Sequence, residues 1–197
     1  MKVEYIKLHS NQINDYINDI ANLRIKVFSE YPYLYQGDIH YERKYLLRYT
    51  KAQSSLIIMA VVDKKLVGLT TCLAMIEEED EFQAPLRDNG FDIEKGFYFG
   101  ESIILSEYRG NGVGHRFFEQ RENHAKKVIP NLSFTCFCAV ERDESKLRPN
   151  NYKPLNHFWN KMGYEFSGIK TRYSWKDIGD SIETVKEMDY WIKNWKK

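Results

Sequence analysis

Hydrophobic positions follow two different periods along the chain, and their alternation predicts a mixed α/β protein. Residues 3–8 alternate between apolar and polar side chains, as a half-buried strand does, whereas residues 55–62 form the continuous apolar run of a buried strand. By the same criteria, strands are also expected at residues 66–75, 97–105, 132–140, 164–175 and 184–195. Helical spacing of apolar residues predicts helices at residues 10 to about 27, 38 to about 49, 113–128 and 155–162.

Short polar side chains mark where the predicted helices begin and where the chain turns. Ser10 and Asp38 can each accept hydrogen bonds from the first free N–H groups of the helix that follows. Asp63-Lys64-Lys65 predicts a tight hairpin turn, and residues 77–90, which are acidic and contain a proline, are expected to be a long connection. Because no repeat or linker is visible, residues 1–197 are expected to form one domain with about seven strands and about four helices.

The near balance of charge argues against a nucleic-acid-binding or membrane-binding protein. Lysine and arginine together number 29, against 28 aspartate and glutamate residues. No apolar run approaches the ~20 residues needed to cross a bilayer, and residues 1–5 lack a signal-peptide core, so a cytoplasmic protein is expected. Cys72, Cys136 and Cys138 are odd in number and the histidines are scattered, which favours buried, reduced thiols over a disulfide framework or a metal site.

The segment Arg109-Gly110-Asn111-Gly112-Val113-Gly114 joins the predicted strand at 97–105 to the predicted helix at 113–128. Its glycines expose backbone N–H groups at the start of a helix, where the helix dipole and Arg109 favour a bound phosphate. The dinucleotide pattern G-x-G-x-x-G would require glycine in place of His115, and no Gly-Lys pair followed by serine or threonine is present for a Walker loop. By itself, the segment fits both a phosphate loop and a simple glycine-rich turn.

The pattern R-x-x-G-x-G between a strand and a helix resembles the pyrophosphate loop of the GNAT superfamily of N-acetyltransferases. The predicted element order β-α-α-β-β-β-α-β-α-β-β is similar to the GNAT fold across essentially the whole chain. The resemblance implies a mixed, mostly antiparallel sheet whose fourth and fifth strands splay apart. It also implies acetyl-CoA as co-substrate, with its pantetheine arm in this gap, and no metal. The residues expected to hold acetyl-CoA are Ile103, Ile104, Leu105, Arg109, Gly110, Asn111, Gly112, Val113, Gly114, Asn151 and Phe158.

Acetyl transfer to an amine requires a base for the amine, and the thiolate leaves more easily if an acid protonates it. Glu101 lies on the fourth predicted strand among aromatic residues, where desolvation would raise its pKa toward neutrality, so it is the candidate base. A solvent-facing carboxylate or a salt bridge is the alternative for Glu101. The resemblance places Trp159 where many GNAT enzymes carry a proton-donating tyrosine, and an indole cannot serve as that acid. Tyr152 is then the candidate acid, or an aromatic residue that packs under the cofactor.

The turn between the first two predicted helices commonly forms one wall of the acceptor site in GNAT enzymes. Here it contains Tyr31, Tyr33, Tyr35 and Asp38, which offer aromatic faces and a carboxylate to an amine or else form a hydrophobic lid. The resemblance implies an acetyl-CoA-dependent N-acetyltransferase acting on a primary amine of a small metabolite or peptide, as a monomer or homodimer. A non-catalytic acyl-CoA-binding module is the alternative, favoured by Trp159.

Overall fold

The computed structural model describes residues 1–140, 142 and 148–195. Within these residues eight strands form one sheet in the order β1-β2-β3-β4-β6-β8-β7, with β5 paired to β3. Only the pair of β4 and β6 is parallel, so the predicted mixed and mostly antiparallel sheet is confirmed. The strands are β1 (Glu4–Leu8), β2 (Leu56–Val62), β3 (Lys65–Ala74), β4 (Gly96–Tyr98), β5 (Ser102–Ile104), β6 (Phe134–Val140), β7 (Glu165–Trp175) and β8 (Thr184–Asn194).

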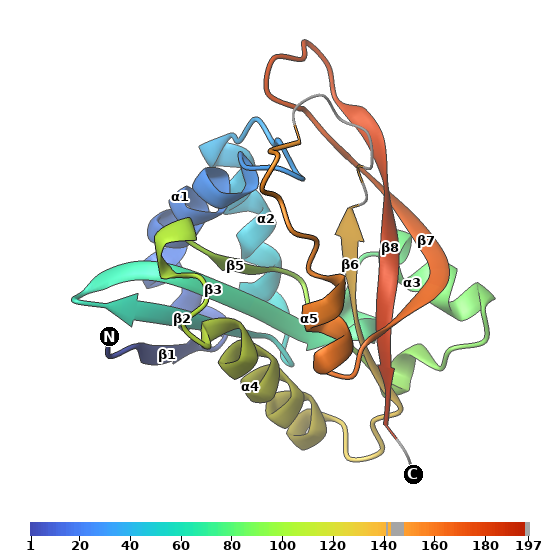
Figure 1. Ribbon diagram of the computed structural model, residues 1–197. Helices are drawn as coiled ribbons and strands as arrows, with labels where there is room; N and C mark the ends of the chain where they lie inside the picture. Colours follow the sequence, from blue (N-terminus) through green and yellow to red (C-terminus); the bar gives the residue numbers. More distant parts are fainter. Residues whose placement is uncertain (141, 143–147, 196–197) are drawn as a thin grey trace.

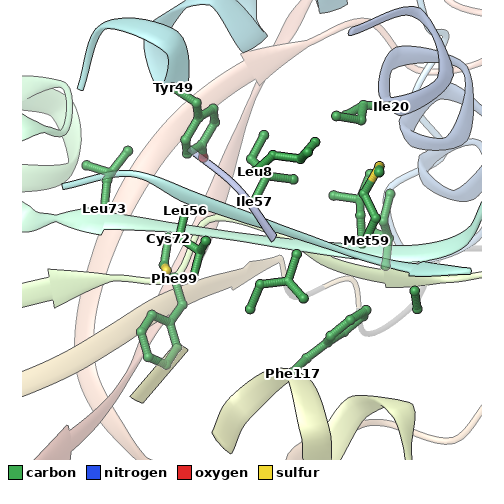
Figure 2. Packing of buried hydrophobic residues seen from close by; sticks show 14 of the residues in the cluster. Leu8, Ile20, Tyr49, Leu56, Ile57, Met59, Cys72, Leu73, Phe99 and Phe117 are labelled. Atoms are coloured by element: carbon green, nitrogen blue, oxygen red, sulfur yellow. The ribbon is translucent and has the colours of Figure 1, made fainter. Parts of the chain in front are cut away.

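Helices cover both faces of the sheet (Figure 1). They are α1 (Ile17–Phe28), α2 (Ile39–Lys51), α3 (Asp80–Asp88), α4 (Val113–Val128) and α5 (Asn156–Lys161). The pair α1 and α2 lies on one face and α4 on the other, and apolar side chains fill both interfaces. Figure 2 shows Ile20 and Tyr49 on the first side and Phe99 and Phe117 on the second, and all four are fully buried. No helix in the described part of the chain is long and apolar enough to cross a membrane.

The start of the first helix differs from the expectation. Ser10 does not cap it, because this residue has a φ of 44° and begins a 3₁₀ turn over Ser10–Tyr16. His9 occupies the N-cap position of that turn, and its backbone N–H donates to the side chain of Gln12. The α-helix itself begins only at Ile17. Asp38 does cap α2 as predicted, because its carboxylate accepts a hydrogen bond of 2.7 Å from the backbone N–H of Tyr41.

The predicted long connection at residues 77–90 was wrong, because it contains α3. Acidic residues in the first turn of α3 favour the helix by complementing its dipole, and Phe82 and Leu86 are buried against the sheet. A proline at position 85 has no N–H for the carbonyl of Glu81, one turn earlier. The hydroxyl of Thr171 on β7 donates to that carbonyl at 2.6 Å instead. A contact between segments distant in sequence therefore makes this helix possible.

The strand predicted at residues 97–105 is interrupted in the middle by a β-bulge. Thr71 on β3 alone faces both Gly100 and Glu101, since the Gly100 N–H donates to the Thr71 carbonyl at 3.1 Å and the Thr71 N–H donates to the Glu101 carbonyl at 3.0 Å. Before the bulge Tyr98 pairs with Leu73, and after it the register is shifted by one residue. The extra residue divides the predicted strand into β4 and β5.

The bulge lies where the two halves of the sheet separate. The segment β4 pairs with β6 from Gly96 to Tyr98, and the Phe99 N–H still donates to the Cys136 carbonyl at 2.8 Å. Beyond this point β5 pairs with β3 and β6 pairs with β8, so nothing joins β5 to β6. Figure 1 shows the two strands diverging, with α5 beside the opening. The predicted splay between the fourth and fifth strands of the sequence is confirmed.

The contact between Thr171 and α3 can be tested with a double-mutant cycle. Thr171→Val keeps the shape of the side chain but leaves the Glu81 carbonyl without its donor, and should lower the free energy of unfolding by about 1–2 kcal/mol. In a Pro85→Ala background the new N–H of residue 85 can donate to the same carbonyl. Thr171→Val should then lower the free energy of unfolding by less than half as much. Urea unfolding of the four proteins measures both costs. Equal costs in the two backgrounds would show that Thr171 acts through other contacts.

Candidate active site

The glycine-rich loop leaves the amino end of α4 open. Gly112 is the N-cap with a φ of 78°, and Gly110 has a φ of 79°. No side chain caps the helix, and no acidic residue lies in its first turn. A Cβ atom at either glycine would meet no atom within 4 Å, so the loop is open to solvent at these two positions. This combination of free donors, positive dipole end and open space suits an anionic group such as a phosphate.

Side chains of the loop hold its shape. The Asn111 amide donates to the carbonyls of Tyr108 and Arg109, at 3.2 and 3.1 Å. The Arg109 guanidinium donates to the Ile104 carbonyl at 2.9 Å and pairs with Glu30 at 2.6 Å, and both charged groups remain half-exposed. Arg109 thus ties the loop to the end of β5 and to the end of α1.

The remaining residues expected to hold a cofactor lie at different depths. Val113 is buried, and Gly114 packs against Phe158, whose ring would lie 3.2 Å from an added Cβ atom. This contact holds α5 against the first turn of α4. Asn151 is exposed in the segment that precedes α5. Gly114 and Phe158 are therefore brought together beside the loop, while Asn151 lies outside that contact.

Only alternate residues of β5 direct their backbone groups into the gap. The Glu101 carbonyl and the Leu105 N–H bond to β3, and Ile103 lies between them in the same orientation. The backbone groups of Ser102 and Ile104 therefore point away from β3, toward the side that β6 has left. Of the three residues expected to line the gap, Ile104 does so, whereas Ile103 and Leu105 bury their side chains in the core. Ser102 was missed because the strand register depends on the bulge.

A cavity of about 100 Å³ lies on the α1 and α2 side of the sheet, and Glu101 of the bulge forms part of its wall. The bulge turns this residue inward, and the Glu101 N–H donates to the Thr71 hydroxyl at 3.1 Å. Aromatic rings supply much of the remaining lining, from the turn after α1, from α2 and from β4 and β7. This lining includes Tyr33, Tyr35, Tyr45, Tyr98, Tyr173 and Trp175.

Three carboxylates and two guanidinium groups share this cavity, and all but one of the five are more than nine-tenths buried. Arg24 of α1 contacts both Glu42 of α2 and Glu101 of the bulge. Arg48 of α2 contacts Glu78, which precedes α3. Burial opposes the charge on Arg24, but its carboxylate neighbours outweigh that effect and its pKa is raised well above the ordinary value. The two arginines are thus held as cations by the carboxylates around them.

Tyr45 connects the two charged groups. Its ring centroid lies 4.2 Å from the guanidinium carbon of Arg24 and 4.9 Å from that of Arg48. Its hydroxyl donates to Glu101 at 3.3 Å. Burial, reinforced by the charge of Glu101, raises the pKa of Tyr45 well above its ordinary value and that of Tyr49 to about 12. Both hydroxyls are therefore neutral donors near pH 7.

The two tyrosines of the predicted acceptor wall that reach the cavity are Tyr33 and Tyr35. The Tyr33 carbonyl accepts hydrogen bonds from Trp175, at 3.0 Å, and from Arg142, at 3.1 Å. Arg142 in turn forms a two-pronged ion pair with Asp177. These contacts anchor the turn after α1 to the end of β7.

Tyr31 and Asp38 lie outside the cavity lining. The Tyr31 hydroxyl donates to the Arg142 carbonyl, and its ring meets Tyr152 edge-on at 4.6 Å. Asp38 is occupied as the cap of α2, which accounts for its carboxylate without a ligand.

Neither Tyr152, the candidate proton donor, nor Trp159, at the position of the usual tyrosine, lines the cavity. Tyr152 packs against Tyr31 and Arg148, and burial raises the pKa of its hydroxyl. Trp159 packs against Phe137 and Trp191, with ring centroids 5.1 and 4.9 Å apart. The indole therefore belongs to an aromatic cluster between α5 and the sheet.

The sequence interpretation missed Arg24, Glu42, Tyr45 and Glu78. Arg24 falls at helical spacing after Ile20 and before Val27, so a charge on an otherwise apolar helix face was a signal of a buried ion pair. Glu42 and Tyr45 likewise share a face with the buried Leu46 of α2. Glu78 belongs to the acidic segment that was expected to be a long connection, yet it is only 5% exposed. The described residues contain no group of three or more His, Cys, Asp or Glu side chains that could hold a metal ion.

Comparison with known proteins shows the fold but no relative in sequence. No protein-family model matches the chain, and no curated protein matches it. Among solved structures, an acetyltransferase of the GNAT family from Streptococcus pneumoniae is 13% identical, with a TM-score of 0.57 over 98% of this chain and 99% of its own. The PaiA N-acetyltransferase from Thermoplasma acidophilum, in complex with coenzyme A, is 13% identical, with a TM-score of 0.57 over 99% and 100%.

Arabidopsis thaliana NAA60, in complex with a bisubstrate analogue, is 10% identical, with a TM-score of 0.61 over 98% of this chain and 100% of its own. These similarities extend over nearly the full length of both chains in each pair, so they concern the whole arrangement of sheet and helices rather than one motif. The chain has the GNAT fold.

Proposed function

We propose that this protein is an acetyl-CoA-dependent N-acetyltransferase that acts on a primary amine. The observation that carries the proposal is the position of Glu101, which belongs both to the bulge beside the open strand edge and to the wall of the aromatic cavity. A thioester held along the edge and an amine held in the cavity would meet at this carboxylate. The acyl-transferring neighbours of the same fold support this interpretation.

The residues around the gap fit acetyl-CoA. The open N–H groups at the start of α4 suit its pyrophosphate, and the positive φ of Gly110 and Gly112 keeps side chains out of that space. The outward backbone groups of Ser102 and the N–H of Ile104 suit the amides of a pantetheine arm, in the manner of an added strand, whereas the Ile104 carbonyl accepts from Arg109. Acetyl-CoA supplies an acetyl group that is activated as a thioester.

The chain's own groups then account for the proton transfers. Glu101 accepts the proton that the ammonium form of the acceptor must lose, directly or through one water molecule. The neutral nitrogen forms a bond to the acetyl carbon while the bond from that carbon to sulfur breaks, and the leaving thiolate takes up a proton. Arg24 and Tyr45 hold the carboxylate of Glu101 in position throughout. Tyr152 is the proposed donor of the proton to sulfur.

A non-catalytic acyl-CoA-binding module is the second candidate. The packed indole of Trp159 favours it, because the residue at this position cannot act as an acid. The two functions differ in a direct assay, in which the protein is mixed with acetyl-CoA and a panel of amines and thiol release is measured. Amine-dependent release supports the enzyme, and its absence with retained CoA binding supports the module.

Two variants of Gly112 test the phosphate loop. Asn and Asp have the same shape and both tolerate a positive φ, so backbone strain is matched and only charge differs. Coenzyme A should raise the melting temperature of the wild type and of Gly112→Asn by mass action. Gly112→Asp should lose most of this shift, because its carboxylate repels the pyrophosphate. Equal shifts in the two variants would place the phosphates elsewhere.

Replacement of Glu101 tests the proposed base. Glu101→Gln keeps size and the acceptor for Tyr45 while removing basicity, and should lower kcat/KM by roughly 10²- to 10⁴-fold, the range for a positioned proton transfer. The melting-temperature shift with CoA should stay at the wild-type value. Glu107→Gln, which makes the same change at an exposed residue beyond β5, should leave kcat/KM unchanged. Wild-type rates in Glu101→Gln would exclude this carboxylate as the base.

A second pair of variants tests the proton donor. Tyr152→Phe should lower kcat by roughly 10²-fold if its hydroxyl protonates the thiolate. Trp159→Phe retains a ring against Phe137 and Trp191 and should turn over at about the wild-type rate. Steady-state rates with acetyl-CoA compare the two directly. A large loss in Trp159→Phe with normal rates in Tyr152→Phe would reverse the assignment.

A further inference from the structure

The charges that line the cavity do not cancel. Its carboxylates are Glu42, Glu78 and Glu101, with exposed fractions of 0%, 5% and 6%. Against these three negative charges, the lining residues that the structure describes contribute two positive charges, Arg24 and Arg48. The tyrosines of the lining add no charge, because burial raises the pKa of each of those for which a shift is resolved, including Tyr33 and Tyr98. The described lining therefore carries three carboxylates and two guanidinium groups, which leaves one negative charge without a positive counterpart among these residues.

Both arginines are already engaged. Arg24 lies between Glu42 and Glu101 and is stacked on Tyr45. Arg48 contacts Glu78, and its second amino group is 3.4 Å from Glu79. An incoming carboxylate would meet no uncommitted cation in the lining. A ligand that carries a second negative group is therefore disfavoured, whereas a second positive group is favoured.

A buried carboxylate oxygen also lacks a donor. The Oε2 atom of Glu78 has no hydrogen-bond partner within the described part of the chain. Glu42 differs, because burial and then the charge of Glu42 and a hydrogen bond to its carboxylate raise the pKa of the Tyr35 hydroxyl, which is therefore a donor for Glu42. Leaving a buried acceptor unpaired costs free energy, so such atoms are normally satisfied by a ligand, an ion or water. An ammonium group supplies both the missing charge and the missing N–H donors.

Glu101 and Glu78 line the same cavity, each beside a different arginine. Glu101 lies beside Arg24 and Glu78 beside Arg48, and the two guanidinium groups lie 4.2 and 4.9 Å from the centroid of the same Tyr45 ring. A ligand that reaches from Glu101 to Glu78 must pass aromatic side chains, which suit methylene groups and cations alike. The cavity volume of about 100 Å³ favours a small ligand over a large one.

We infer that the acceptor is a short aliphatic diamine, with one amine beside Glu101 and the other held as an ammonium by Glu78. This inference rests on the proposed function for the identity of the reaction. The amine beside Glu101 loses a proton and gains the acetyl group, the carbon–sulfur bond of the thioester breaks, and the thiolate gains a proton. The distal ammonium is unchanged and serves only to position the chain. Amino acids are expected to be poor acceptors, because both arginines of the described lining are already paired with glutamates.

Three acceptors of similar size test the inference with the wild-type protein. Cadaverine has two amines, hexylamine has a methyl group in place of one amine, and 5-aminovalerate, called aminovalerate below, has a carboxylate in place of one terminal CH2–NH2 group. With acetyl-CoA, cadaverine should have the highest kcat/KM, about 10- to 100-fold above hexylamine, as expected for one buried charge-assisted hydrogen bond. Aminovalerate should be the poorest. A kcat/KM for hexylamine or aminovalerate equal to or above that of cadaverine would overturn the inference.

A matched pair of variants locates the distal ammonium. Glu78→Gln removes the charge and should lower the ratio of kcat/KM for cadaverine to that for hexylamine by about tenfold or more. Glu79→Gln makes the same change next to it, at a half-exposed residue outside the cavity lining, and should keep the wild-type ratio. Because the measurement is a ratio within one protein, a partial loss of folded enzyme does not affect it. An unchanged ratio in Glu78→Gln would exclude Glu78 as the anchor and overturn the inference.

Calorimetric titration separates failure of this inference from failure of the proposed function. Cadaverine and hexylamine are titrated into the wild-type protein in the presence of CoA, where no acetyl group can be transferred. Tighter binding of cadaverine supports the diamine site even if no amine yields thiol release, in which case only the proposed reaction fails. Equal binding of the two amines, or none, overturns the diamine site, even if thiol is released with other amines.

Discussion

The bulge opposite Thr71 is the constraint on which the rest of the site depends. It requires glycine at position 100, because an added Cβ atom there would lie 2.4 Å from the Tyr49 hydroxyl and 2.5 Å from the Thr71 hydroxyl. The one extra residue shifts the register, so that the chain leaves β6 and continues beside β3 alone. It also turns the carboxylate of Glu101 into the cavity. One irregularity in a ladder thus opens the strand edge and places a charged group next to it.

The buried charges around the cavity depend on one another in the same way. Removing Arg24, Glu42 and Glu101 from water is costly, and their mutual attraction offsets that cost only while all of them are in place. Stacking of both arginines on Tyr45 links this group to the second one at Arg48. Such a network fixes the positions of side chains that would otherwise be flexible. The proposed base and the proposed anchor for the distal amine are therefore held at a set separation.

The gap and the cavity serve different parts of one proposed reaction. The gap presents backbone groups and the open end of α4, which recognise polar and anionic groups without regard to side-chain identity. The cavity presents aromatic rings and carboxylates, which select by charge and size. The bulge is the point where these two surfaces meet.

Local pattern in the sequence determined most strands, the cap of α2 at Asp38 and the glycine loop before α4, because each depends on neighbouring residues. The splay followed from resemblance of the element order to a known fold. Only the tertiary structure decided the bulge, helix α3 and the charged cavity. Each of these depends on contacts between segments that are distant in sequence. Thr171 donates to the Glu81 carbonyl, for which Pro85 has no N–H, and Arg24 forms an ion pair with Glu101. Sequence periodicity shows which face of an element is buried, but it does not show which charges will meet there.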